Sequence, residues 1–136
     1  MSIKHLLSQL RLELNMETAI LAQISDNQYK IEDISSTMDI FNPGDTFDLT
    51  QTYCEAVIQS QKLVTYTNVG KIQKMRLHPV YTLLQLESYI GYPIIINDQV
   101  WGTLNLSSTD IRGSEFTLAE IEKVKNTAVQ ITRELT

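Results

Sequence analysis

Two β-hairpin patterns, one near each end of the sequence, constrain the fold of this chain more than any other feature. The first covers residues 18–34 and turns at Asp26-Asn27-Gln28, and the second covers residues 88–108 and turns at Asn97-Asp98-Gln99. Both turns use residues that tolerate positive φ, and apolar or alternating segments flank them. Hairpins place their strands in antiparallel order, so the sequence predicts one antiparallel sheet that contains both.

Helical periodicity flanks the two hairpins. Apolar residues at three- and four-residue spacing predict a helix over residues 3–14. The sequence Thr117-Leu-Ala-Glu120 resembles a capping box and predicts a second helix over residues 117–135. An amphipathic helix must bury its apolar side, so we expect an α+β fold whose terminal helices cover a common face of the sheet.

The middle of the chain supplies elements for the other face. Residues 50–60 favour a helix, with Asp48 or Thr50 as N-cap, and residues 63–67 favour a short strand. Residues 68–86 form a long irregular segment. Segments of that length inside compact domains are usually functional, so we expect this one to cover the face opposite the terminal helices.

Length, charge and cysteine content narrow the function classes. The chain has 136 residues, which corresponds to a single domain over residues 1–136, and its net charge is −5. An acidic chain without clustered Lys and Arg is not expected to bind nucleic acid or anionic membranes. Cys54 is the only cysteine, which excludes an intrachain disulfide and favours a cytoplasmic location. No apolar run approaches the roughly 18 residues of a membrane span.

Five short motifs occur in an order that resembles a known family: Tyr53-Cys-Glu-Ala-Val57, His78-Pro79, Ser88-Tyr-Ile-Gly-Tyr-Pro-Ile94, Trp101-Gly-Thr-Leu-Asn-Leu106 and Phe116-Thr-Leu-Ala-Glu-Ile-Glu122. Together they resemble a GAF domain of the bacterial signalling type. The resemblance implies a central six-stranded antiparallel sheet with the N- and C-terminal helices on one face. It also implies a ligand pocket under helices and loops on the other face.

Strand alternation over residues 100–108 suggests which side chains face that pocket. Val100, Gly102, Leu104 and Leu106 point one way, toward the helix-covered core. Trp101, Thr103, Asn105 and Ser107 point the other way and form a mixed polar face. With the aromatic residues of the family motifs, this predicts the following ligand-binding candidates: Tyr53, His78, Tyr81, Tyr89, Asn105 and Ser107.

The resemblance also raises one enzymatic alternative, the free methionine-R-sulfoxide reductases, which share the GAF fold. Cys54 matches one cysteine of that family, but no cysteine stands in the segment before Ser88 where the nucleophile belongs. Asn105 and Ser107 stand where the reductases carry acids, and Tyr89 replaces a glutamate. We therefore expect no enzymatic activity. Cys54 is expected to be a buried helix residue, with a redox-sensing thiol as the alternative.

No cofactor is indicated by the sequence. One cysteine and the two histidines, His5 and His78, do not form a metal-ligand cluster or a haem site. Bilin-binding members attach their chromophore through a cysteine that is usually followed by histidine, whereas Glu55 follows Cys54. The asparagine, lysine, phenylalanine and acidic set of the cyclic-nucleotide-binding members has no match. The sequence therefore indicates a small-molecule ligand of no particular class.

Two functions fit these observations. The first is a sensory domain that binds a small molecule and transmits occupancy through its terminal helices to a fused or separate signalling output domain. The second is a dimerisation or protein-interaction module with a vestigial pocket. Apolar stripes on the two helices predict a homodimer, with these interface candidates: Ile3, Leu6, Leu10, Ile121, Val124, Ala128, Ile131 and Leu135.

Overall fold

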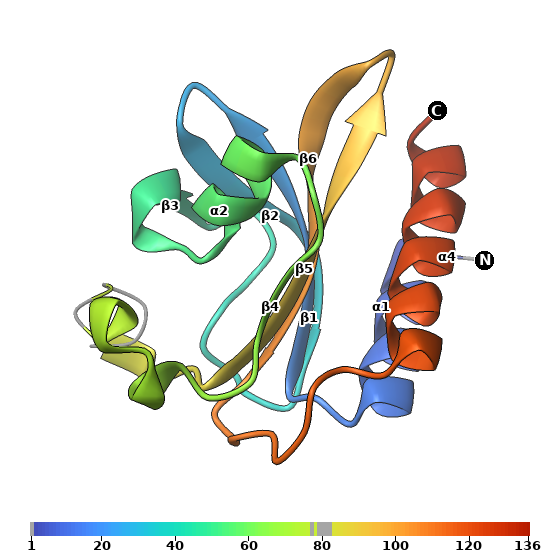
Figure 1. The fold of residues 1–136 in the computed structure, drawn as a ribbon. Helices are drawn as coiled ribbons and strands as arrows, with labels where there is room; N and C mark the ends of the chain where they lie inside the picture. The colour runs from blue at the N-terminus through green and yellow to red at the C-terminus, as the bar shows by residue number, and fades with distance from the viewer. Residues whose placement is uncertain (1, 77, 79–82) are drawn as a thin grey trace.

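A computed structural model describes residues 2–76, 78 and 83–136 of the chain. Helices and strands follow in the order expected from the two hairpins and the terminal helices (Figure 1). Their bounds are α1 Ile3–Leu14, β1 Thr18–Ser25, β2 Gln28–Ser36, β3 Thr46–Asp48, η1 Leu49–Gln51, α2 Cys54–Ser60, β4 Val64–Tyr66, η2 Val69–Lys71, η3 Gln73–Met75, β5 Ser88–Ile96, β6 Gln99–Ser108 and α4 Leu118–Leu135.

The sheet has six strands in the order β3-β2-β1-β6-β5-β4, and every neighbouring pair is antiparallel. The pairing of β1 with β6 joins the two hairpins, with Leu21 opposite Leu104. Both predicted hairpins therefore lie in one sheet, and the α+β prediction is confirmed. Strand β3 has no clear signal in the sequence because it is only three residues long.

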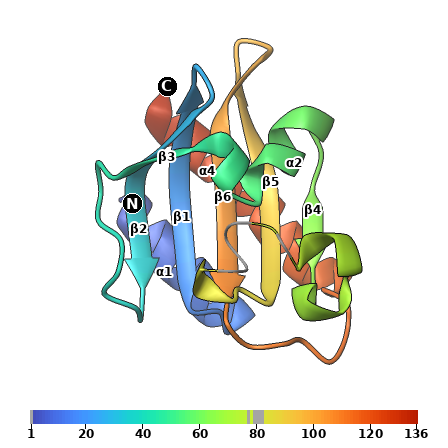
Figure 2. The same ribbon diagram turned by 90° about the vertical axis from the view of Figure 1, so that its left-hand side faces the viewer.

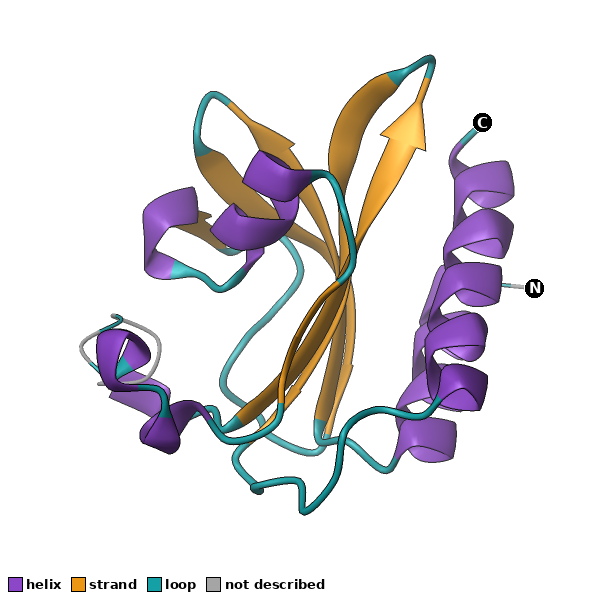
Figure 3. Cartoon of the chain, viewed as in Figure 1, coloured by secondary structure: helices purple, strands orange, loops and turns teal. Residues whose placement is uncertain are grey.

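The terminal helices α1 and α4 lie side by side on one face of the sheet (Figures 1 and 3). Ser2 caps α1 by accepting a hydrogen bond from the His5 backbone N–H. The predicted capping box of α4 is present, with Thr117 and Glu120 bonded to each other's backbone N–H groups. An aliphatic core fills the space between the helices and the sheet, and we call it the helix-side core: Leu6, Leu7, Leu10, Leu14, Met16, Ala19, Leu21, Ile90, Ile94, Leu104, Leu106, Phe116, Val124, Ala128 and Ile131.

The predicted dimer stripe belongs to this monomer core, which corrects the assignment of those residues to a subunit interface. Leu6, Leu10, Val124, Ala128 and Ile131 are buried against the sheet. The remaining candidates, Ile3, Ile121 and Leu135, are partly buried and pack against the same core. Each helix has one main apolar face, and covering the sheet uses it.

The opposite face is covered by α2 and by the segment that includes η2 and η3 (Figure 2). The helix predicted over residues 50–60 is divided in two. Asp48 precedes the 3-10 turn η1, and α2 begins only at Cys54, with Tyr53 at its N-cap position. Asp48 stands at the N-cap position of η1 and Thr50 lies inside that turn. Neither Asp48 nor Tyr53 makes a side-chain capping hydrogen bond, so the expected capping of one helix by Asp48 or Thr50 is wrong.

A bulge in the second hairpin changes which way one large side chain points. In the pairing of β5 with β6, Ile94 lies opposite Gly102 and Ile95 lies opposite Val100, so Trp101 has no partner. Trp101 consequently packs against the helix-side core. The prediction that it shares a face with Asn105 is wrong, because alternation continues only where the ladder is regular.

A cavity between the sheet and α2

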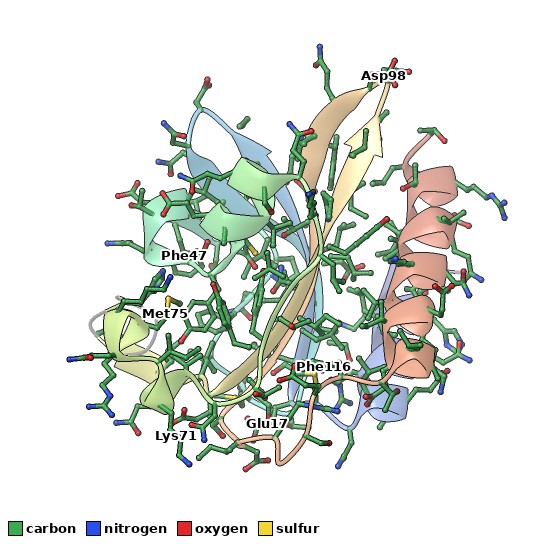
Figure 4. The ribbon with its side chains drawn as sticks, in the orientation of Figure 1. Glu17, Phe47, Lys71, Met75, Asp98 and Phe116 are labelled. Carbon is green, nitrogen blue, oxygen red and sulfur yellow. The ribbon has the colours of Figure 1, made fainter. Side chains whose placement is uncertain are left out.

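The face of the sheet opposite α1 and α4 borders a cavity of about 360 Å³. Its floor comes from β1, β2, β5 and β6. Its walls come from the loop before β3, from β3, η1 and the start of α2, and from the segment before β5. Figure 4 labels Phe47, one of the wall residues, on the α2 side of the sheet. The described lining residues are Ile20, Tyr29, Ile31, Phe41, Phe47, Gln51, Thr52, Tyr53, Cys54, Leu83, Leu84, Leu86, Tyr89, Asn105 and Ser107.

Strand β6 contributes to both faces of the sheet. Leu104 and Leu106 lie in the helix-side core, whereas Asn105 and Ser107 line the cavity. The same alternation in β1 places Ala19 and Leu21 toward the helices and Ile20 toward the cavity. The polar side chains of β6 are therefore presented to the cavity by a central strand with both neighbours in place.

A buried hydrogen-bond network connects the floor to α2. The Asn105 side-chain nitrogen Nδ2 donates to Tyr29 Oη at 3.3 Å and to Thr103 Oγ1 at 3.1 Å. Thr103 Oγ1 lies 3.3 Å from Cys54 Sγ, which in turn lies 3.0 Å from Tyr89 Oη. Because Thr103 accepts from Asn105, its own proton is available to the sulfur of Cys54. The network fixes the rotamers of side chains on β2, β5, β6 and α2.

Aromatic rings form one wall around Tyr53. The Tyr53 ring lies 5.5 Å from the ring of Tyr66 and 5.5 Å from that of Tyr89, both in edge-to-face geometry. The hydroxyl group of Tyr53 donates to the Leu86 carbonyl oxygen at 2.8 Å. The imidazole of His78 lies 4.9 Å from the Tyr53 ring on the outer side of this cluster. Tyr53 thus ties α2 to the segment before β5.

Gly91 makes room for the side chain of Tyr89. A Cβ atom at position 91 would lie 2.2 Å from Tyr89 Oη and under 3 Å from two of its ring carbons. Residues 89 and 91 share one face of β5, so the tyrosine ring folds back over the glycine. The mid-strand glycine therefore positions the Tyr89 hydroxyl group beside Cys54.

Burial keeps the titratable groups of the cavity uncharged. It raises the pKa of Cys54 to about 11, and it raises the pKa values of Tyr29 and Tyr89 well above their ordinary range. Burial also lowers the pKa of His78, against opposing effects of Thr52 and Glu55. The Cys54 side chain is a neutral thiol at physiological pH, which disfavours the redox-sensing alternative.

The structure brings together four of the six predicted ligand-binding candidates. Tyr53, Tyr89, Asn105 and Ser107 line the cavity, as does Cys54. His78 is not among the lining residues, although its ring contacts Tyr53 of the aromatic wall, and Tyr81 lies outside the described residues. We did not predict Tyr29 and Ile31 of β2 or Phe41 and Phe47. Alternation in β2 could have identified the first pair, whereas the phenylalanines come from a loop and a three-residue strand without periodicity.

Two features are absent from the described residues, a metal-binding cluster and a membrane-spanning helix. No group of three or more His, Cys, Asp or Glu side chains there has the geometry to hold a metal ion. None of the described helices combines the length and the hydropathy that crossing a membrane requires.

An open antiparallel sheet with helices on one face and a roofed cavity on the other defines the class of fold, and comparison with known proteins gives the family. The GAF domain family model matches residues 3–135, and the chain therefore belongs to the GAF domain family. No curated protein sequence matches the chain significantly.

Solved structures of GAF domains share the fold at low sequence identity. The GAF domain of an Acinetobacter phosphoenolpyruvate-protein phosphotransferase is 13% identical, with a TM-score of 0.76 over 97% of this chain and 78% of that chain. A phycocyanobilin-bound GAF domain from a cyanobacterial phytochrome is 15% identical, with a TM-score of 0.71, and the match covers 96% of this chain and 82% of that chain. These bacterial neighbours agree with the bacterial type of the sequence motifs.

Proposed function

We propose that this chain is a sensory GAF domain that binds a small molecule in the cavity between the sheet and α2. The single observation that carries the proposal is the cavity of about 360 Å³, within the size range of roughly 300–1,000 Å³ for small-molecule sites. A vestigial pocket would be filled by its own side chains. The phycocyanobilin-bound neighbour is a GAF domain with a small-molecule ligand, which supports the same interpretation.

The arrangement of β6 suggests how occupancy would reach the terminal helices. A ligand in contact with Asn105 and Ser107 touches the strand whose alternate residues, Leu104 and Leu106, pack against α1 and α4. If the strand can adopt two positions, a ligand with a higher affinity for one of them would shift the strand, and the helices packed on it, toward that position. We propose that α1 and α4 pass this bias to a fused or separate signalling output domain.

Three further properties belong to the proposal. The neutral, buried thiol of Cys54 and the absence of carboxylates from the described cavity lining favour a regulatory rather than an enzymatic role. A free cysteine favours a cytoplasmic location. A homodimer would need surfaces other than the predicted stripe, and Leu12, Leu118 and Val129 remain exposed on the two terminal helices.

Native mass spectrometry of protein purified from its own host tests the proposal. We expect a mass excess over the polypeptide that disappears under denaturing conditions, because a non-covalent ligand leaves when the cavity unfolds. A protein of bare polypeptide mass, whose thermal stability does not respond to any fraction of a host metabolite extract, would contradict the proposal and favour the interaction-module alternative.

A further inference from the structure

The cavity has no charged side chain in its lining. All of the described residues around it are aliphatic, aromatic, amide, hydroxyl or thiol residues. The residues outside the described part of the chain, at positions 1, 77 and 79–82, include no Asp, Glu, Lys or Arg in the sequence. The chain has 27 charged residues in total, from 11 basic and 16 acidic ones, so their absence from this surface is a specific property of the site.

An ionised ligand would therefore lose its hydration without gaining a counter-charge. Transfer of an unpaired charge from water into an apolar site is strongly unfavourable, and buried ions require a partner of opposite charge. Cys54, Tyr29 and Tyr89 do not supply an anion at physiological pH, because burial raises the pKa of each of them. Phosphate, carboxylate and ammonium groups are thus disfavoured in the enclosed part of the cavity.

The polar atoms that do reach the cavity are concentrated on its floor. Ser107 is 7% exposed and lines the cavity, and its hydroxyl group can both donate and accept a hydrogen bond. The amide nitrogen of Asn105 is occupied by Tyr29 and Thr103, which leaves its carbonyl oxygen as an acceptor. One uncharged polar group on a ligand can be satisfied here, while rings such as Phe47 and Tyr53 surround the rest.

Resting on the function proposed above, we infer that the ligand is an uncharged, mainly apolar ring compound with a single polar group directed at Asn105 and Ser107. The volume of about 360 Å³ is at the lower end of the range for small-molecule sites and suits up to about three fused or linked rings. A nucleotide, an amino acid or an organic acid would not fit this description, because each carries a charge at physiological pH.

Two dyes with the same anilinonaphthalene rings test the inference. N-phenyl-1-naphthylamine is uncharged, and 8-anilinonaphthalene-1-sulfonate carries one sulfonate. In fluorescence titrations of the purified chain, we expect the uncharged dye to bind at least about tenfold more tightly. Only the sulfonate group loses its hydration on binding without gaining a partner of opposite charge. Circular dichroism and thermal unfolding of the same samples establish that the protein is folded.

Two pairs of variants locate the binding and its charge selectivity. Ile20→Phe adds bulk to the cavity floor, and Ile95→Phe makes the same change at a position that is 45% exposed and outside the cavity. We expect only the first to weaken the uncharged dye, by about tenfold or more. Gln51→Arg places a cation in the lining at an exposed residue, and Gln99→Arg is its control at an exposed residue at the start of β6, outside the lining. Only Gln51→Arg should strengthen sulfonate binding, by about tenfold.

The outcomes separate this inference from the proposed function. If the sulfonate dye binds wild-type protein as tightly as the uncharged dye, the charge selectivity is wrong, but ligand binding in the cavity stands. If neither dye binds, or if Ile20→Phe changes neither affinity, the inference is overturned, and the mass excess in native mass spectrometry decides the proposed function independently. Equal responses of Gln51→Arg and Gln99→Arg would also contradict the inferred role of the lining.

Discussion

The two faces of the sheet are built from the same strands but differ in packing and in chemistry. The face toward α1 and α4 is packed with aliphatic side chains, and Leu7, Leu104, Leu106, Val124 and Ile131 are completely inaccessible to solvent. The face toward α2 carries tyrosines, polar groups of β6 and a cavity of about 360 Å³. Dense packing provides stability on the first face. On the second face, side chains that border the cavity make fewer van der Waals contacts, and the cavity has room for another molecule.

The strand β6 shows how one sequence serves both purposes. Its odd-numbered residues 103, 105 and 107 are polar, and its even-numbered residues 104 and 106 are leucines. Thr103, Asn105 and Ser107 are nearly inaccessible as well, so the difference between the faces is one of chemistry and not of exposure. Buried polar groups are tolerated because the network with Tyr29 and Cys54 satisfies most of them.

The largest expected difference between the faces is in stability. Ile131→Ala should lower the free energy of unfolding by about 2–5 kcal/mol, because the side chain is fully buried in the helix-side core. Ile20→Ala, on the cavity floor, should cost about 2 kcal/mol or less, because part of its surface already borders empty space. Urea unfolding measures both. Equal losses would show that the two faces are packed alike.

A smaller difference is expected between the two mid-strand glycines. At Gly102 a Cβ atom would lie 1.9 Å from the Ala22 carbonyl oxygen, which is backbone of the adjacent strand, so Gly102→Ala should cost about 3 kcal/mol. At Gly91 the obstacle is the Tyr89 side chain, which can rotate. Gly91→Ala should cost less stability and should instead move the Tyr89 hydroxyl group away from Cys54. Thermal unfolding and a crystal structure of Gly91→Ala distinguish these outcomes.

Cys54, on the cavity face, provides a third comparison, between the reactivity of its thiol in the folded and in the unfolded chain. With its pKa raised to about 11 from an ordinary value of 9.0, the folded thiol has about a hundredfold less thiolate at pH 8. Iodoacetamide should therefore label the folded protein at least about a hundredfold more slowly than the urea-unfolded chain. Labelling at similar rates would restore the redox-sensing role of Cys54.

The smallest effect is expected at the end of the sheet, where Glu17 joins the two hairpins. The backbone N–H of Thr109 donates to Glu17, and this lowers the pKa of the carboxyl group despite partial desolvation. The stabilisation is complete above the ordinary value of 4.5 and is lost as the pH falls through the lower folded value. Glu17→Gln should cost about 1 kcal/mol at pH 7 and reduce the loss of stability as the pH falls below 4.5. An unchanged acid profile would contradict this account.

Much of the fold could be predicted because its signals are local. Positive-φ residues at Asp26, Asn27, Asn97 and Asp98 form the two turns, and these alone specify both hairpins. The capping box at Thr117 and Glu120 is equally local. The candidate site was predicted in part: Asn105, Ser107, Tyr53 and Tyr89 line the cavity, whereas Tyr29, Phe41 and Phe47 were not identified.

Where the sequence-based predictions failed, contacts between distant segments were responsible. Trp101 points toward the helices because a bulge opposite Ile94 and Ile95 interrupts the alternation, and a bulge has no reliable local signal here. The stripe containing Val124, Ala128 and Ile131 was assigned to a dimer, although one apolar helix face can cover either a second subunit or the chain's own sheet.

The sequence by itself determined the antiparallel sheet, the terminal helices and the polar face of β6, because turn residues and the two-residue and 3.6-residue periods act within a few positions of the chain. The tertiary structure alone decided that the helices use their apolar faces on the sheet, that Tyr89 folds over Gly91, and that space remains under α2. A cavity is the volume left after segments distant in the sequence have packed, and no short-range pattern encodes that volume.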